Sequence, residues 1–273
     1  MDFARPFDEA SRRVERNSSL LEVLALEEID RDLYRAGYVA QDDLALFGGQ
    51  VAAQALQAAG ATVDDDRAPN SLHGYFLRAG DAERPTVFRV HRDRDGRSYS
   101  ARRVEALQDG RVIFSMAASF AVAQDGVDRQ AATMTTTEMP GELTPFPLAR
   151  ITTIEARAPQ QEPADSPWPT RFWARSTADL GSNPLTHACA LTYISDISSA
   201  ITPDRDGLHR PGASLDHAVW FHRPLSLNDW VLIELTPHSI ASERGWYTGT
   251  VFDEGGVALA SFAQECLFRP VPE

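Results

Sequence analysis

Side chains suited to acid–base or nucleophilic chemistry occur in this sequence, but the common motifs that arrange them do not. No GxSxG nucleophile motif is present, and the strand–helix alternation that goes with it is also missing. Asp216 and His217 are adjacent within a strand pattern, so their side chains point to opposite faces and cannot form a proton relay with each other. A serine hydrolase is therefore disfavoured, and this pair is expected to serve the structure.

Several kinds of cofactor and metal chemistry lack the residues that they need. All 26 basic residues are arginine, which excludes a lysine Schiff base, a lysine general base and a P-loop lysine. Cys189 and Cys266 are isolated, and neither a CxxC nor an HExxH pattern occurs, so we expect no metal site. In a reducing compartment both cysteines are expected to be small buried hydrophobic residues.

The charge and hydropathy of the chain limit its partners. A formal net charge of −13 disfavours nucleic acid, which needs a broad cationic surface. No apolar run approaches the roughly 20 residues that cross a bilayer, and the N-terminal residues contain no apolar signal segment. We therefore expect a cytoplasmic protein with neither a nucleic-acid partner nor a membrane partner.

One group of arginines could still hold an anionic small molecule. The stretch 91–97 carries three arginines and is followed by Arg102 and Arg103. On this basis Arg97 and Arg102 are candidate substrate-binding residues. A solvated face of a β-hairpin would explain the same charges equally well.

The sequence contains an internal repeat. Phe76-Leu77-Arg78 recurs as Phe221-His222-Arg223, and the turn Asp109-Gly110 recurs as Glu254-Gly255. Both recurrences have the same offset, because 223 minus 78 and 255 minus 110 both give 145. Two copies of one structural unit explain this constant offset.

Each copy shows a helix pattern followed by a series of strand patterns. The first helix is the alanine-rich stretch 50–59, preceded by Gly48 and Gly49, and the second lies around 185–201. The strand patterns of the first copy are 71–78, 86–93, 98–107 and 112–123, and those of the second copy are 214–221, 230–238, 245–253 and 257–268.

This order of elements predicts an α+β fold. An antiparallel sheet that wraps one long helix is the hotdog arrangement, so two such units predict a tandem, or double, hotdog with two sheets. We place the first repeat at 1–123 and the second at 184–273. Residues 124–183, which are rich in threonine, proline and charge, are predicted to form a linker.

Several longer motifs resemble those of the type II (TesB-like) family of acyl-CoA thioesterases. In the first half these motifs are 47–51, 73–81 and 98–104, and in the second half they are 195–196, 216–224 and 261–265. The resemblance runs from about residue 21 to about residue 270. Because several motifs occur in the right order, the match is far more specific than one short pattern.

The resemblance implies three catalytic positions, and here they hold Asp196, Ser214 and Gln264. In the family these are an aspartate on the second helix, a Ser or Thr two residues before the Asp-His pair, and a glutamine on the last strand. The resemblance also implies hydrolysis of fatty acyl-CoA, no metal or redox cofactor, and a homo-oligomer, either a dimer or a tetramer. Ala79 departs from a frequent proline, and Ser214 replaces a frequent threonine but keeps the hydroxyl.

These residue types suit the hydrolysis of a thioester. Its carbonyl is electrophilic and its thiolate leaves readily, with a pKa near about 8.5 by analogy with cysteine. The main requirement is therefore a well-placed water molecule and a group that accepts its proton. Asp196 can accept that proton, while a hydroxyl and an amide fix the water. Backbone N–H groups at Gly48 and Gly49, before the first helix, are candidate donors to the oxyanion.

The repeat favours one specialised copy. At the offset of 145, and assuming no gap, the three catalytic candidates fall on Val51, Pro69 and Ser119. The first copy thus lacks the carboxylate and the amide.

Two other interpretations use the same fold. A non-catalytic acyl-CoA-binding regulator could be built on the same pocket, although the presence of all three polar side chains argues against it. A hotdog enoyl-CoA hydratase would have a histidine five residues after its aspartate, where this chain has Ile201. Hydration is therefore disfavoured.

Overall fold

A computed structural model describes residues 19–37, 46–146, 148, 153–159, 169–197, 201 and 208–270. The helices are α1 (Leu20–Leu24), α2 (Gly48–Gly60) and α3 (Pro184–Ser195), with a short 3-10 turn η2 (Pro140–Glu142). The strands are β1 (Leu26–Asp30), β2 (Leu33–Ala36), β3 (Arg67–Phe76), β4 (Thr86–Asp95), β5 (Tyr99–Gln108), β6 (Arg111–Val122), β7 (Ile154–Arg157), β8 (Arg171–Ser176), β9 (His209–Ser214), β10 (Asp216–Phe221), β11 (Val231–Ala241), β12 (Arg244–Asp253) and β13 (Ala258–Pro270).

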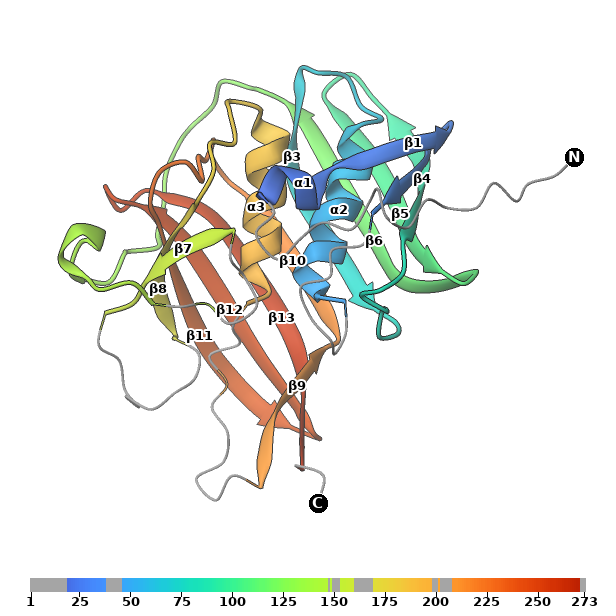
Figure 1. Cartoon of the computed structure of the whole chain (residues 1–273). Coiled ribbons are helices and arrows are strands. Elements are labelled where there is room, and N and C mark those ends of the chain that lie inside the picture. The colour runs from blue at the N-terminus through green and yellow to red at the C-terminus, as the bar shows by residue number, and fades with distance from the viewer. Residues whose placement is uncertain are drawn as a thin grey trace, which may run out of the picture.

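The strands form one antiparallel sheet, so the prediction of two sheets is corrected. Its order is β1-β2-β4-β5-β6-β3-β10-β13-β12-β11-β8-β7, with β9 paired to β13. The two halves join where β3 and β10 pair, from Tyr75 opposite Asp216 to Ser71 opposite Trp220. Separate sheets would leave each of these strands with an unpaired edge of backbone N–H and C=O groups. Figure 1 shows the joined sheet behind α2 and α3.

The junction accounts for the internal repeat. His73 pairs with Ala218 across β3 and β10, and 218 minus 73 is again 145. An antiparallel pair that joins a residue to its own counterpart is what a local two-fold axis produces. The two copies are therefore related by an approximate two-fold axis at the centre of the sheet.

The second copy departs from this offset by one residue in its last strand. Arg102 pairs with Ala118, and Tyr247, which lies 145 positions after Arg102, pairs with Gln264. The counterpart of Gln264 is therefore Ala118, and the predicted correspondence with Ser119 is wrong. The physical reason is that the β12–β13 hairpin contains one residue more than the β5–β6 hairpin between these pairs.

The offset also fails for the helices. Asp196 is the C-cap residue of α3, whereas Val51 lies in the first turn of α2, whose C-cap is Ala61. The counterpart of Asp196 is thus at the end of α2, and the predicted pairing with Val51 is wrong. The connection between helix and strand differs in length between the copies.

Two helices pack closely against each other beneath the sheet. A Cβ atom on Gly49 would lie 2.3 Å from the Tyr193 carbonyl oxygen, and one on Gly60 would lie 2.4 Å from the Leu185 side chain. These contacts show that α2 and α3 run antiparallel, and that glycine permits their close approach. Gly48 and Gly49, predicted to precede the first helix, form its first turn.

The second helix is shorter than predicted. It begins after Asn183, whose side chain accepts a hydrogen bond from the Leu185 N–H at 2.9 Å, with Pro184 in its first turn. It ends at Ser195 and not at Ile201, and residues 198–200 of the predicted helix lie outside the described residues.

Residues 124–183, predicted as a linker, contribute two strands to the sheet. β8 pairs with β11, and β7 pairs with β8 at the end of the sheet. Trp173 on β8 is fully buried. The division of the chain at 123 and 184 otherwise stays a prediction.

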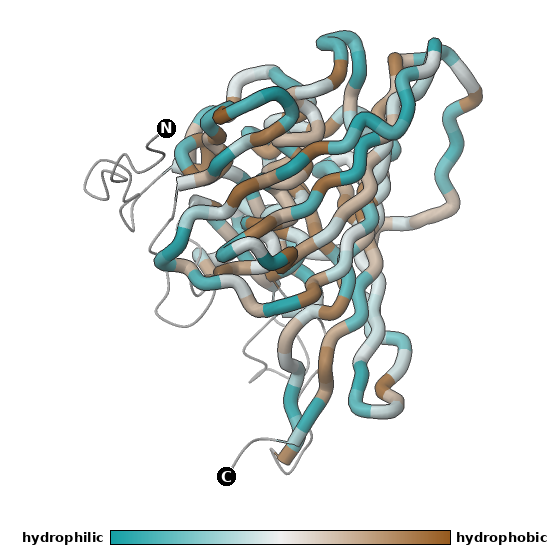
Figure 2. Tube along the Cα trace, turned by 90° about the vertical axis from the view of Figure 1, so that its right-hand side faces the viewer, coloured by the Kyte–Doolittle hydropathy of each residue, from teal (hydrophilic) through white to brown (hydrophobic). Residues whose placement is uncertain are grey.

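Hydrophobic and hydrophilic residues alternate along many of the strands (Figure 2). This period of two places one face of the sheet against the helices and leaves the other face outside. Both cysteines are buried, as expected. None of the described helices is long and apolar enough to cross a membrane.

Candidate active site

A cavity of about 620 Å³ lies between the start of α2 and the end of α3. Both copies line it, so its shape depends on the junction of the two halves. Phe47, Phe76 and Phe114 come from the first copy, and Tyr247 and Leu267 come from the second. Its polar lining includes the three side chains predicted to be catalytic, Asp196, Ser214 and Gln264.

The structure brings these three side chains into mutual hydrogen bonds. The Ser214 hydroxyl donates to Asp196 Oδ1 at 3.0 Å, and the Gln264 amide nitrogen donates to the same oxygen at 2.6 Å. Gln264 Nε2 also donates to Ser214 Oγ. A helix end, β9 and β13 thus place a carboxylate, a hydroxyl and an amide together.

The second oxygen of the carboxylate faces the other helix. A Cβ atom on Gly48 would lie 2.6 Å from Asp196 Oδ2, so glycine leaves the space that this oxygen occupies. No side chain caps the N-terminus of α2 at Phe47, and the positive end of the helix dipole therefore lies beside the carboxylate. Gly48 lines the cavity, whereas Gly49 packs against the Tyr193 backbone.

His217 belongs to this network, although the sequence assigned it only a structural role. Its Nδ1 atom contacts Gln264 Oε1, and its Nε2 atom lies 2.8 Å from Ser195 Oγ. The side chain is fully buried. Burial lowers the pKa of His217, and the nearby charge of Asp196 opposes this only in part. The alternation along β10, which puts His217 on the face opposite Asp216, was the available signal.

Two other groups in the cavity wall are held neutral. Burial raises the pKa of Tyr247 well above its usual value, and the charge of Asp196 adds to the effect. Burial likewise raises the pKa of Cys266 to about 11. Among the described residues that line the cavity, Asp196 is the one carboxylate.

The predicted arginines do not reach this cavity. Arg102 is buried, and its guanidinium donates to Thr62 Oγ1 at 2.8 Å and to Asp95 Oδ1 at 2.7 Å. The first bond ties β5 to the end of α2 and the second ties it to β4, so the prediction of Arg102 as a substrate-binding residue is corrected to a structural role. Arg97 is exposed in the turn between β4 and β5, and it does not line the cavity.

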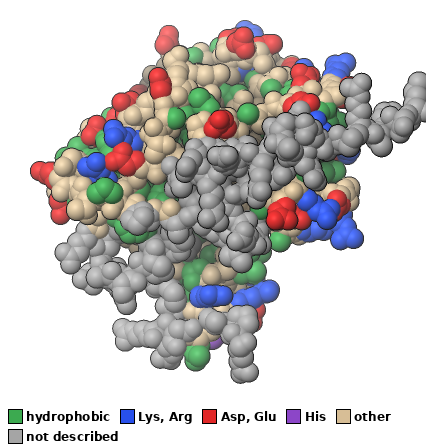
Figure 3. Space-filling model, in the orientation of Figure 1, with side chains coloured by type: hydrophobic (Ala, Val, Ile, Leu, Met, Phe, Trp, Pro, Cys, Tyr) green, Lys and Arg blue, Asp and Glu red, His purple; other side chains and the backbone are tan. Residues whose placement is uncertain are grey.

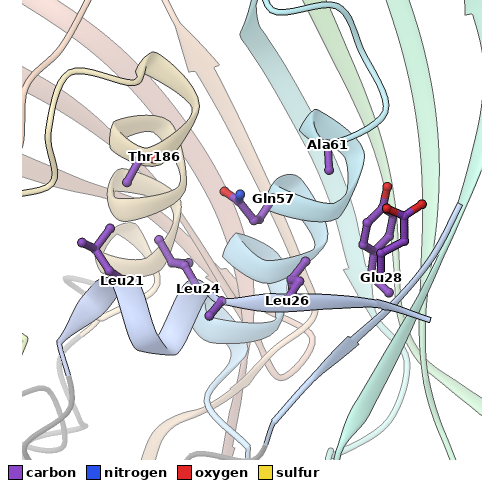
Figure 4. A pocket seen from close by; sticks show the side chains of 9 residues that line it. Leu21, Leu24, Leu26, Glu28, Gln57, Ala61 and Thr186 are labelled. Atoms are coloured by element: carbon purple, nitrogen blue, oxygen red, sulfur yellow. The ribbon is translucent and has the colours of Figure 1, made fainter. Parts of the chain in front are cut away.

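A smaller cavity of about 290 Å³ lies at the other end of α2. Figure 4 shows Gln57 on α2 and Thr186 on the neighbouring α3 beside it. Gln57 Oε1 accepts a hydrogen bond from the Cys189 thiol at 3.5 Å. This cavity contains none of the three catalytic candidates.

The described surface shows mixed charge. Basic side chains lie beside acidic ones on the face in Figure 3, without a broad cationic patch there. Within the described ranges, no group of three or more His, Cys, Asp and Glu side chains is arranged to hold a metal ion.

Family models match both halves of the chain. Residues 36–121 match an acyl-CoA thioesterase N-terminal domain, and residues 125–268 match an acyl-CoA thioesterase C-terminal domain. Human acyl-coenzyme A thioesterase 8 is 33% identical over 92% of this chain and 89% of its own length. Acyl-CoA thioesterase 2 of Haemophilus influenzae is 31% identical over 92% of this chain and 97% of its own length.

Solved structures give the same result. The acyl-CoA thioesterase II TesB2 of Mycobacterium marinum is 36% identical, with a TM-score of 0.79 over 92% of this chain and 97% of that chain. The tesB protein of Mycobacterium avium is 30% identical, with a TM-score of 0.81 over 92% and 98% of the two chains. A hotdog-fold protein of Alicyclobacillus acidocaldarius, at 20% identity and a TM-score of 0.77, supports the fold alone.

The fold is of the hotdog type, and its cavity holds a carboxylate that is hydrogen-bonded to a hydroxyl and an amide. The chain belongs to the acyl-CoA thioesterase family. These matches confirm the resemblance to acyl-CoA thioesterases that the sequence motifs indicated. They also confirm the predicted thioester hydrolase activity and the acyl-CoA substrate class.

The neutral state of His217 predicts lower stability in acid. Burial lowers its pKa in the folded chain, whereas the unfolded chain keeps the usual value of about 6.5. As pH falls below about 6.5, the unfolded state binds a proton that the folded state excludes, so stability falls by up to about 1.4 kcal/mol per pH unit. The Tm measured from pH 7.5 to 5 should fall less steeply in His217→Gln than in the unchanged chain. Equal slopes would contradict this account.

Proposed function

We propose that the chain hydrolyses fatty acyl-CoA by direct attack of a water molecule held by Asp196, Ser214 and Gln264, on a double hotdog fold. The observation that carries the proposal is the hydrogen-bonded cluster of these three side chains in the wall of a largely apolar cavity. Phe47, Phe76 and other apolar residues of the cavity would receive the acyl chain.

The carboxylate provides a general base. Asp196 Oδ1 already accepts bonds from Ser214 and Gln264, which leaves Oδ2 to accept a proton from the attacking water. The water oxygen bonds to the thioester carbonyl carbon, and Asp196 takes its proton. The carbon–sulfur bond then breaks, and the departing CoA thiolate takes up that proton, which leaves a free fatty acid and CoA.

The first turn of α2 would stabilise the developing negative charge. Gly48 lines the cavity beside Asp196 Oδ2, and the N–H groups of a helix N-terminus favour an anion. Of the two glycines predicted to donate to the oxyanion, Gly48 is better placed, because Gly49 faces the Tyr193 backbone.

Replacement of the carboxylate tests the proposal directly. Asp196→Asn should lower kcat for acyl-CoA by about 10²- to 10⁴-fold, because the amide cannot accept the proton of the water. A thiol reagent measures the release of CoA, and calorimetry with an uncleaved acyl-CoA analogue measures binding, which should persist. If the unchanged chain binds acyl-CoA and releases no thiol, it is a binding regulator and the proposal fails.

We propose that Arg78, and not Arg97 or Arg102, contacts the CoA phosphates. It is exposed, and it carries the only positive charge among the described residues that line the cavity. Its Nη1 atom donates to the Val112 carbonyl oxygen at 2.6 Å, which holds the guanidinium in place. A local cation is needed because a chain with a net charge of −13 repels an anionic substrate.

Two arginine variants test this contact. Arg78→Ala should raise KM for acyl-CoA about 10-fold with little change in kcat, since one charge-assisted hydrogen bond contributes about 1.5 to 3 kcal/mol. Arg97→Ala, a matched exposed arginine at the other end of α2, should leave KM unchanged. If Arg97→Ala raised KM and Arg78→Ala did not, the prediction from the sequence that Arg97 binds the substrate would hold. Steady-state kinetics at fixed ionic strength provides the comparison.

We also propose that the chain is cytoplasmic and that it forms a homo-oligomer. The outer face of β3 and β10 is a candidate surface for a second copy, because Tyr75 and Trp220 are 63% and 38% exposed there. Trp220 packs edge-on against the His73 ring, and the neighbouring Ala117 and Ala218 carry no charge. Asp216, opposite Tyr75, also lies on this face, so the aromatic rings of Tyr75 and Trp220 would supply the contact area between two copies.

Substitution on this face tests the assembly. Trp220→Arg should shift the mass measured by light scattering from that of an oligomer to that of a 30.1 kDa chain, because each copy would bury a new charge. Val127→Arg, at a residue that is 85% exposed in a loop, should leave the mass unchanged. This surface would be ruled out as the contact between copies if the parent chain were a monomer, or if the Trp220→Arg variant had the same mass as the parent oligomer.

A further inference from the structure

We infer that His217 is a positioning residue that fixes the orientation of the Gln264 amide through an Nδ1–H donor. Ser195 holds the opposite side of the imidazole ring. The inference rests on the proposed function, since it concerns how Gln264 is presented to Asp196 and the attacking water.

The two ends of the Gln264 amide differ in what they can donate and accept. Gln264 lies against Asp196 Oδ1, and an ionised carboxylate only accepts hydrogen bonds. The NH2 end must therefore face Asp196, because a rotated amide would place its oxygen against a charged oxygen. This orientation leaves Gln264 Oε1 facing His217 Nδ1.

The orientation of the amide determines the tautomer of His217. An amide oxygen accepts, so His217 Nδ1 must carry the hydrogen. In a neutral ring Nε2 is then an acceptor, and the Ser195 hydroxyl lies 2.8 Å from it. The same hydroxyl lies 3.1 Å from the Thr192 carbonyl oxygen, but its single hydrogen can satisfy Nε2. Hydrogen bonds thus run in one direction from Ser195 to Asp196.

The internal repeat separates this role from a general packing role. At the strand junction the offset of 145 makes Leu72 the counterpart of His217, and the hairpin pairs make Ala118 the counterpart of Gln264. The last residues of the two helices, Ser195 and Gly60, also correspond. The copy without the amide therefore lacks the histidine and the hydroxyl as well, although Leu72 is equally buried.

Two substitutions distinguish the two ring nitrogens. His217→Asn places an N–H donor near the position of Nδ1, whereas His217→Gln extends its amide toward the position of Nε2. We expect His217→Asn to keep kcat within about 5-fold of the parent chain. His217→Gln should lose about 10- to 100-fold in kcat with a small change in KM, since a misplacement of about 1 Å near the reacting atoms can cost 10²-fold.

The Tm of both variants supplies the structural control. A merely structural role would reduce activity in proportion to the loss of Tm and would not distinguish Asn from Gln. Equal losses of kcat in the two variants, or full activity in both, would overturn the inference.

A second measurement does not depend on activity. In the ¹⁵N NMR spectrum of histidine-labelled protein at pH 7, the signals absent from His217→Gln should show a protonated Nδ1 and an unprotonated Nε2. The opposite tautomer would overturn the inference even in an active enzyme. Conversely, a chain that shows the protonated Nδ1 but releases no CoA would contradict only the proposed function. The orientation of Gln264 would then still be established.

Discussion

The site depends on how one carboxylate is stabilised at the place where the two copies meet. Asp196 is partly withdrawn from water, and such a charge needs hydrogen-bond donors. Ser214 and Gln264 supply donors from its own copy, and the uncapped start of α2 supplies a favourable dipole from the other. α2 and α3 run antiparallel in contact, so the end of α3 lies beside the start of α2, and the pairing of β3 with β10 joins the two copies in one sheet.

The approximate two-fold axis creates a second, equivalent place, and different side chains fill it. The counterpart of Tyr247 is Arg102, which lies near the end of α2 as Tyr247 lies near the end of α3. There the guanidinium bonds to Thr62 and Asp95, so a buried charge is satisfied by the protein alone. One junction thus exposes a carboxylate to a cavity, while the charged group near the other is an arginine whose hydrogen bonds are made within the protein.

The sequence predicted most elements and the three polar residues, because the helix and strand patterns and the long motifs are local properties. It did not predict the single sheet, since the pairing of β3 with β10 joins strands from different halves. Arg102 was misassigned because a run of arginines does not reveal which one is buried. His217 was missed because its role lies in contacts with Ser195 and Gln264, from two other elements. The one-residue difference between hairpins changed the apparent counterpart of Gln264.

A thiol in the cavity wall offers a covalent alternative to direct attack by water, and its protonation state argues for water. Cys266 lines the cavity, and a thiolate there could attack the thioester and form an acyl-cysteine. Burial raises its pKa to about 11, so at neutral pH the thiolate fraction is on the order of one in ten thousand. The negative charge of Asp196 contributes to this raised pKa. The carboxylate that would activate the water molecule in the proposed mechanism thus also disfavours covalent attack by the neighbouring thiol.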